Sequence, residues 1–197
     1  MKNILLLISF ILLLGCKNEN NLENENTKSK TQEVYSEIVD NKLVYAVINS
    51  ALLNRDKENI IKNCDAVINR KTTVFINYDS TFIKKFDTIF NENEKKFILK
   101  QYKNGNHFIL DQSFVENKKV IEIDTTIFYS EKKKKSFWKK INEDNKCISF
   151  IYVPLFNLKK DLAIVECGTR GETGIFIYKL ESNGKWKLNK TVEKIIE

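Results

Sequence analysis

Alternating apolar and polar residues in the last third of the chain predict a run of β-strands. The pattern covers four segments joined by short connections: Cys147–Phe156, Leu162–Cys167, Gly174–Glu181 and Lys185–Val192. Strands joined by short turns pair antiparallel, because a parallel pair needs a long crossover. This third of the chain is therefore predicted to form an antiparallel β-meander.

The turn before the last strand sets the register of the two strands that it joins. A two-residue Asn183-Gly184 loop would place Leu180 opposite Lys187, whereas a three-residue loop with a left-handed Gly184 places Leu180 opposite Trp186. The second register is predicted, because a one-residue slip would scatter the apolar residues between the two faces of the sheet. The shared face would then carry Phe176, Tyr178, Leu180, Trp186, Leu188 and Val192.

The first half of the domain shows helical spacing instead. Within Glu33–Asn54, apolar residues recur at steps of three and four, and Thr31 is the candidate N-cap. Asn91 and Glu94 have the spacing of a capping box, so a second helix is predicted over Glu92–Lys103. The inward residues of the first helix would be Val44, Tyr45, Val47, Ile48, Ala51 and Leu52.

Two further strands are predicted from alternation at Thr73–Tyr78 and Val120–Tyr129, the second with Ile121 and Tyr129 on one face. Taken together, the elements predict an α+β domain, with N-terminal helices packed on a C-terminal antiparallel β-meander.

The first residues form a pattern of their own. Lys2 is followed by an apolar stretch, Ile4–Leu14, which is broken only by Ser9. The stretch has the length of a signal-peptide core and falls short of the ~20 apolar residues that span a bilayer. It ends in Leu13-Leu14-Gly15-Cys16, which resembles the lipobox of bacterial lipoproteins.

The lipobox resemblance implies how the chain is processed and where it is held. In that family a peptidase cuts before the cysteine, which then carries acyl chains, so Met1–Gly15 would be removed and Cys16 would anchor the chain. Two or three acyl chains make a stable anchor, since each buried CH₂ contributes ~0.8 kcal/mol. Residues 16–32 would then form the lipidated cysteine and a polar tether, and residues 33–197 a single domain. Lys17 is not the Asp that marks inner-membrane retention, so the expected location is the cell envelope at the outer membrane.

The rest of the chain resembles a group of uncharacterised secreted bacterial domains. The likeness rests on Tyr78–Thr81, on an aromatic segment with Trp138, and on the closing meander with its Asn-Gly-Lys-Trp turn at residues 183–186. The resemblance implies the fold and an extracytoplasmic location, and it implies no activity.

Composition narrows the range of partners. The 197 residues carry a formal charge of +7, spread over many lysine doublets, with the densest run at Lys132–Lys135. Such charge can attract anionic lipid or nucleic acid. No nucleic-acid motif is present, so no nucleic-acid partner is expected, and a solvated lysine-rich surface is the simplest interpretation.

Four cysteines and one histidine limit the chemistry. With Cys16 lipidated, Cys64, Cys147 and Cys167 remain, which allows one disulfide in an oxidising compartment. Cys147 and Cys167 would be directly opposed if the turn between their strands centred on Asn157, and separated if it centred later. No spacing resembles a zinc site and His107 is alone, so neither a metal nor a cofactor is expected.

No catalytic residue can be assigned. Gly168–Gly174 lacks the Lys and the following helix of a phosphate-binding loop, so a flexible hairpin loop is predicted there. Asp79-Ser80-Thr81 has no aligned base and is interpreted as a turn capped by Asp79. The candidate partner-binding residues are Glu166, Arg170 and Glu172, whose charged groups can make strong hydrogen bonds.

Two function classes follow from these observations. The first is a non-enzymatic binding or interaction module, held at the membrane through Cys16, with an envelope protein or polysaccharide as its partner. The second is an envelope hydrolase that uses carboxylates not recognisable in the sequence. The sequence favours the first, because it shows no nucleophile with an aligned base.

Overall fold

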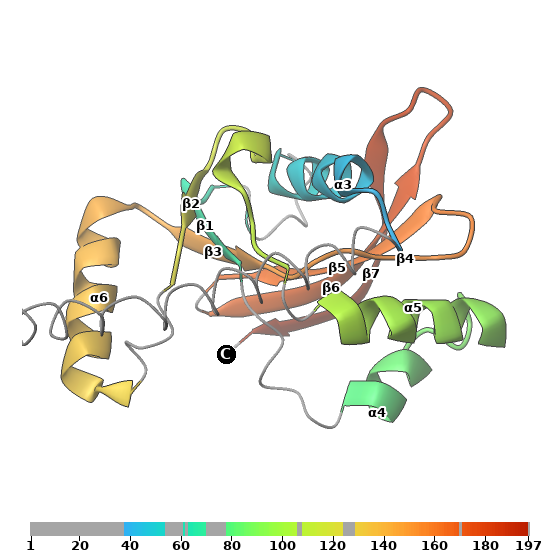
Figure 1. Ribbon diagram of the computed structural model, residues 1–197, viewed down its shortest axis with the longest axis horizontal. Coiled ribbons are helices and arrows are strands. Elements are labelled where there is room, and N and C mark those ends of the chain that lie inside the picture. The colour runs from blue at the N-terminus through green and yellow to red at the C-terminus, as the bar shows by residue number, and fades with distance from the viewer. Residues whose placement is uncertain are drawn as a thin grey trace, which may run out of the picture.

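The computed structural model describes residues 38–53, 61, 63–69, 78–105, 108–123, 129–169 and 171–196 (Figure 1). The predictions made for Cys16, the tether, Thr31, His107, Arg170 and most of Thr73–Tyr78 lie outside these residues. None of the described helices is long and apolar enough to cross a membrane.

A mixed seven-stranded sheet forms the centre of the molecule, so the α+β class is correct. Six strands follow the order β2-β1-β3-β5-β6-β7, and β4 pairs with β5 beside them. The pairs β1–β2 and β1–β3 are parallel, so the sheet extends beyond the predicted antiparallel meander and is not purely antiparallel. The strands are β1 Ala66–Asn69, β2 Lys119–Ile121, β3 Ile148–Ile151, β4 Leu155–Phe156, β5 Leu162–Gly168, β6 Glu172–Leu180 and β7 Trp186–Ile196.

The predicted C-terminal meander and the register of its last turn are confirmed. Leu180 lies opposite Trp186 and Tyr178 opposite Leu188, and Gly184 has φ +78°. Two later register shifts skip Asn189 and Val192 along β7. Val192 therefore packs against the hydrophobic cluster on the other face, not with Trp186 as predicted.

The predicted strand Cys147–Phe156 is interrupted. β3 pairs Ile151 with Cys167, whereas β4 pairs Leu155 with Ile164, so the register changes across residues 152–154. Pro154 lies in this break and has no backbone N–H to give to a strand partner.

One face of the sheet, called here the α3 face, is covered by helix α3 (Asn41–Leu53) (Figure 1). All six predicted inward residues of this helix are buried. The helix begins at Asn41 and not at Glu33, because Asp40 accepts hydrogen bonds from Lys42, Leu43 and Val44 and so caps it. The core beneath it includes Val165, Phe176, Tyr178 and Trp186.

The opposite face of the sheet, the one away from α3, is covered by α4 and α5 at one end and by another helix at the other end. Helices α4 (Tyr78–Lys84) and α5 (Glu92–Asn104) cover the part near β4–β7 (Figure 1). The predicted capping box is confirmed: the Asn91 side chain accepts from the Glu94 N–H, and the Glu94 carboxylate accepts from the Asn91 N–H. The predicted turn at Asp79–Thr81 is part of helix α4 instead. The core here is formed by Phe82, Phe86, Phe90, Ile98, Leu155, Ile164, Ile175 and Ile177.

Helix α6 (Glu131–Asp144) packs on the other end of that opposite face, over β1, β2 and β3. The sequence analysis did not predict it. Its one buried residue is Ile141, with Phe137 and Trp138 partly buried beside it. Tyr129, just before the helix, is 90% exposed and so does not lie on the inner face of a strand as predicted. A short 3₁₀ helix, η2 (Gln112–Phe114), precedes β2.

Candidate functional site

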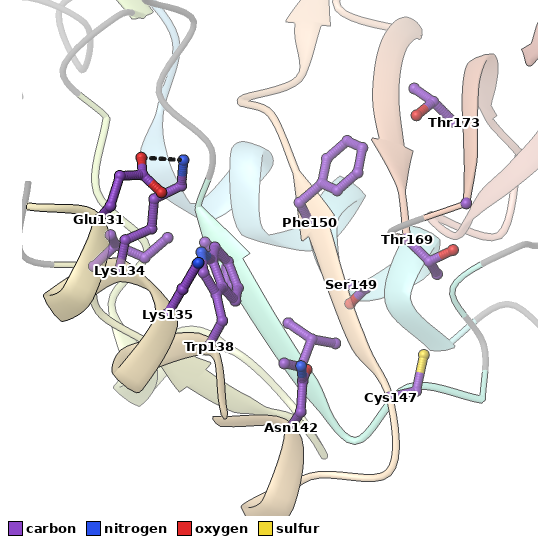
Figure 2. Close-up of a pocket in the computed structure, with 14 residues that line it drawn as sticks. Glu131, Lys134, Lys135, Trp138, Asn142, Cys147, Ser149, Phe150, Thr169 and Thr173 are labelled. Carbon is purple, nitrogen blue, oxygen red and sulfur yellow. Dashed lines mark hydrogen bonds and ion pairs between the residues drawn. The ribbon is translucent and has the colours of Figure 1, made fainter. Parts of the chain in front are cut away.

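A groove of about 920 Å³ lies on the opposite face of the sheet, between α6 and the turn that joins β5 to β6. It is larger than a second cavity, of about 320 Å³, that lies beside η2 and β2. Side chains from α6, β1, β3 and the β5–β6 turn surround it (Figure 2). Its volume falls at the upper end of the range typical of small-molecule sites.

One wall of the groove is a single stripe of α6. Glu131, Lys134, Lys135, Trp138 and Asn142 follow one another at helical steps of three and four, so they share one side of the helix. Ser130 starts the helix by accepting a hydrogen bond from the Lys133 N–H at 3.4 Å. Lys135 and Trp138 project from the helix toward the sheet (Figure 2).

The floor of the groove is apolar and is shaped by a glycine. Phe150 lies opposite Gly168 across β3 and β5. A Cβ atom at position 168 would come within 2.7 Å of the Phe150 ring and 2.4 Å of the Glu172 carbonyl oxygen. Gly168 therefore leaves room for the Phe150 ring next to β5, and Ile68, Ile123 and Ile148 line the groove with it.

The far rim of the groove is a tight turn. β5 continues through Gly168 and β6 begins at Glu172, and the Thr169 N–H donates to the Glu172 carbonyl oxygen at 2.7 Å. Most of the predicted flexible loop Gly168–Gly174 is therefore strand. Thr169 and Thr173 bring hydroxyl groups to this rim.

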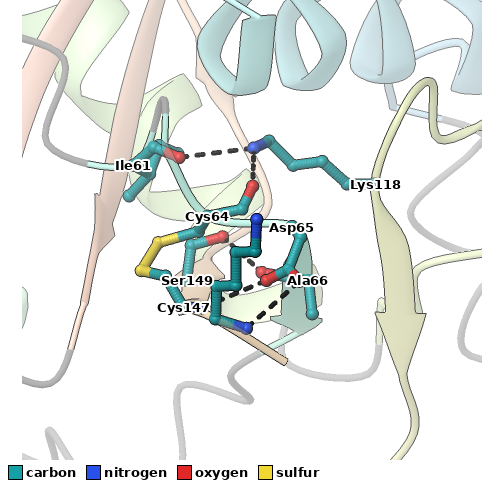
Figure 3. Close-up of a disulfide and its surroundings, with 8 residues drawn as sticks. Ile61, Cys64, Asp65, Ala66, Lys118, Cys147 and Ser149 are labelled. Atoms are coloured by element: carbon teal, nitrogen blue, oxygen red, sulfur yellow. Dashed lines mark hydrogen bonds between the residues drawn. A yellow bond between two sulfur atoms is a disulfide. The ribbon is translucent and has the colours of Figure 1, made fainter. Parts of the chain in front are cut away.

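A disulfide closes one end of the groove, and it joins Cys147 to Cys64 (Figure 3). Of the two alternatives left open for Cys147 and Cys167, the structure shows the separated one: Cys167 lies opposite Ile151, because the turn between their strands centres later than Asn157. Cys167 is a free, buried thiol, and burial raises its pKa above the usual value. The disulfide ties the start of β1 to the start of β3 across 83 residues of chain.

Two charged residues support the disulfide segment. The Asp65 carboxylate accepts from the backbone N–H groups of Cys147 (3.1 Å) and Lys146 (3.2 Å), and these bonds lower its pKa. Lys118 is buried, and its ammonium donates to the carbonyl oxygens of Ile61 and Cys64 (Figure 3). Burial lowers the pKa of Lys118. These contacts hold the backbone beside the groove in one conformation.

The structure describes two of the three candidate partner-binding residues, Glu166 and Glu172. Glu166 lies inside β5 and pairs with Ile175 of β6, on the face of the sheet away from α3. Glu172 lies at the start of β6, six residues further along the chain, and forms an ion pair with Lys194 of β7. Arg170 lies outside the described residues. Glu166 and Glu172 do not line the groove.

The groove offers binding groups and few reactive ones. Glu131 is the one carboxylate among the described residues that line it. Among the described residues, no group of three or more His, Cys, Asp or Glu side chains gathers closely enough to hold a metal ion. The arrangement can hold a ligand through apolar contact, hydroxyl groups and lysines.

The sequence contains one further signal for this site. Ser130 has the N-cap type, and Phe137, Trp138 and Ile141 recur at steps of three and four after it. The lysine run Lys132–Lys135 lowers the mean hydropathy of this segment, so its helical spacing of apolar residues is hard to recognise. The parallel strand β1 carried a weaker signal, since four residues are too few to show a period.

No protein-family model, curated protein or solved structure matches this chain.

Proposed function

We propose that the chain is a cell-envelope lipoprotein whose domain binds a ligand in the α6 groove. The observation that carries the binding role is the groove itself: a large concave site with an apolar floor, edged by hydroxyl groups and lysines. The lipobox at Leu13–Cys16 supports the envelope location. A polar tether after Cys16 would let the domain reach ligands near the membrane surface.

Binding explains the groove better than turnover does. Hydrolysis by a carboxylate pair needs two such groups facing one substrate, and the described lining holds Glu131 alone. Glu131 is also engaged by Lys134, at 3.3 Å. An envelope protein or a polysaccharide segment is the partner class that location suggests, and a small envelope molecule fits the size of the groove.

Hydrogen exchange on the full chain tests the binding role. Protein, glycan and lipid fractions of the envelope are added separately, and amide protection is mapped by peptide. Protection should be confined to peptides from α6, β3 and the β5–β6 turn. The double variant Trp138→Ala, Phe150→Ala should abolish it, whereas Tyr129→Ala should not, because Tyr129 is exposed and does not line the groove.

Two outcomes of that experiment would contradict the proposal. Protection that maps elsewhere, or that survives in the double variant, would remove the groove as the binding site. Steady cleavage of an added peptide, glycan or ester, lost in a single carboxylate variant, would make the hydrolase interpretation correct.

Membrane attachment is tested separately through Cys16. The variant Cys16→Ser should stay uncleaved and should no longer be modified by acyl chains, as intact-mass measurement would show. A variant that carries the same acyl mass as the parent protein would contradict lipidation at this residue.

A further inference from the structure

We propose that the ligand of the groove is an amphipathic anion, an acyl-type chain that ends in a carboxylate or phosphate. This inference rests on the proposed function, because it assigns a chemical class to the ligand of the same groove. It follows from how apolar and charged side chains are distributed around the cavity.

The apolar part of the lining suits a hydrocarbon chain. Ile68 and Ile148 lie on β1 and β3, and Ile123 follows β2; the ring of Phe150 lies in the floor with them, and the ring of Trp138 comes from α6. The residues that line the groove extend from α6 across β1 and β3 to the β5–β6 turn (Figure 2). Burial of CH₂ groups against such a surface contributes about 0.8 kcal/mol each in general.

The charged part of the lining is positive and lies at one side. Lys134 and Lys135 both line the groove, against the single carboxylate of Glu131. Glu131 pairs with Lys134 at 3.3 Å. Lys135 is exposed and forms no ion pair with any described residue. Among the described residues, no acidic side chain therefore neutralises the charge of Lys135, which lines the groove together with Trp138.

The lining fits this ligand better than the alternatives. A sugar needs several polar groups around the aromatic ring that it stacks on, whereas the sheet residues of the cluster to which Trp138 belongs are all apolar, Ala66, Ile68, Ile121 and Ile148. A cationic amphiphile would meet two lysines. A neutral alkyl chain would contact the apolar floor but would offer no anionic group to the lysines.

Two sources could supply the same chemistry, a free fatty acid or a membrane phospholipid with an anionic headgroup. Both present a hydrocarbon chain next to a negative charge. The expected anchor at Cys16 would bring the groove within reach of either source.

Photolabelling of the full chain in phosphatidylcholine discs tests the inference. The probes are a medium-chain fatty acid that carries a diazirine, the matching primary alcohol and the matching trimethylammonium compound. A photoactivatable phosphatidylglycerol, added in vesicles, represents the membrane source. The labelled positions are mapped by peptide, so lipid that surrounds the anchor does not confuse the result.

Charge reversal on α6 supplies the variant and its control. Lys134→Glu, Lys135→Glu removes the positive side of the groove. Lys139→Glu, Lys140→Glu makes the same charge change on the same helix, at exposed positions that do not line the groove. Glutamate is a good helix former, so α6 should persist in both.

The inference expects the fatty acid to label peptides from α6 and β3, and the alcohol and ammonium probes to label them weakly. The first variant should lower labelling by the fatty acid about tenfold, and the control variant should leave it unchanged. Labelling by phosphatidylglycerol as well would support the inference with membrane lipid as a source, and labelling by the fatty acid alone would support it with the free acid.

Equal labelling by the alcohol, or no effect of the first variant, would overturn the anionic assignment and leave the groove as a binding site. Absence of any label in the groove would also overturn the inference. The hydrogen-exchange experiment above decides independently whether the groove binds something else.

Discussion

Helices α5 and α6 lie on the same face of one sheet, yet they are attached to it in different ways. On α5, Ile98 and Gln101 are fully buried. The Gln101 amide donates to the Phe156 carbonyl oxygen at 2.6 Å and accepts from the Phe156 N–H at 2.8 Å. On α6, Ile141 is the one buried residue, and six lysines stand against three acidic residues.

This difference shows where the sheet face is closed and where it is open. At the α5 end, aromatic side chains and a buried amide seal the face. At the α6 end, the aromatic rings are only partly buried and lysines line the edge, so the groove remains open. We therefore expect core changes at the α5 end to cost stability, and changes along the groove side of α6 to alter binding instead.

The largest expected effect is the loss of a buried ring at the α5 end. Phe86 is fully buried, so Phe86→Ala should lower the free energy of unfolding by ~3–5 kcal/mol. Phe137→Ala on α6 should cost ~1–2 kcal/mol, because this ring is only partly buried. Urea denaturation of both variants measures the contrast. Equal losses would show that α6 is packed as firmly as the α5 end.

The disulfide should matter nearly as much, and it acts at the α6 end. Cys64→Ser, Cys147→Ser should lower the free energy of unfolding by ~2–4 kcal/mol, because the bond restricts a long segment of the unfolded chain. The unfolding free energy of the parent protein, measured with and without reductant, should differ by a similar amount. Since Cys167 is free, reductant should leave the stability of the double variant unchanged, and a loss there would contradict the assigned pairing.

The two hydrogen bonds between the Gln101 side chain and the Phe156 backbone should contribute somewhat less to stability. Gln101→Leu leaves the Phe156 N–H and carbonyl oxygen without their side-chain partners, at a cost of ~2–3 kcal/mol. Asn142→Leu is the matched change on α6, where the side chain is exposed, and should shift stability by less than ~0.5 kcal/mol. A similar loss of stability for the two variants in thermal unfolding would argue against a stabilising role of the Gln101–Phe156 hydrogen bonds.

The smallest effect is a pH dependence at the α6 end. Hydrogen bonds from the Cys147 and Lys146 N–H groups lower the pKa of Asp65 in the folded state. A lowered folded pKa adds stability above the unfolded value, near 4, which is lost as the pH falls through the folded pKa. Asp65→Asn should thus flatten the decline in unfolding free energy below about pH 4. Asp144→Asn serves as the control, and an identical change in both variants would contradict this assignment.

The C-terminal meander and two helices could be predicted from local patterns. The Asn183-Gly184 turn determined a register, and Asn91 with Glu94 formed the expected capping box. The start of α3 was placed too early, because Asp40 gives a local cap that the periodic pattern does not reveal. These elements depend mainly on neighbours in sequence, so the sequence was enough to find them.

The groove depends on contacts between distant segments, and it was not predicted. β1 pairs with strands that lie more than fifty residues later, and its pairing positions Ile68 and Phe150 side by side. The turn between β4 and β5 centres later than Asn157, which separates Cys167 from Cys147, and Cys147 is bonded to Cys64 instead. Neither fact follows from a local pattern. The lysines of α6 could be seen in the sequence, but the sheet face that they border could not.

The most direct test of the groove uses the two tryptophans of the chain, which lie on opposite faces of the sheet. Trp138 lines the groove, whereas Trp186 is buried on the α3 face against Phe156. Each is observed alone in the full chain, with Trp186→Phe or Trp138→Phe, while a brominated fatty acid is added. The account predicts saturable quenching of Trp138 and none of Trp186. Equal quenching of both, or quenching of Trp186 alone, would contradict it.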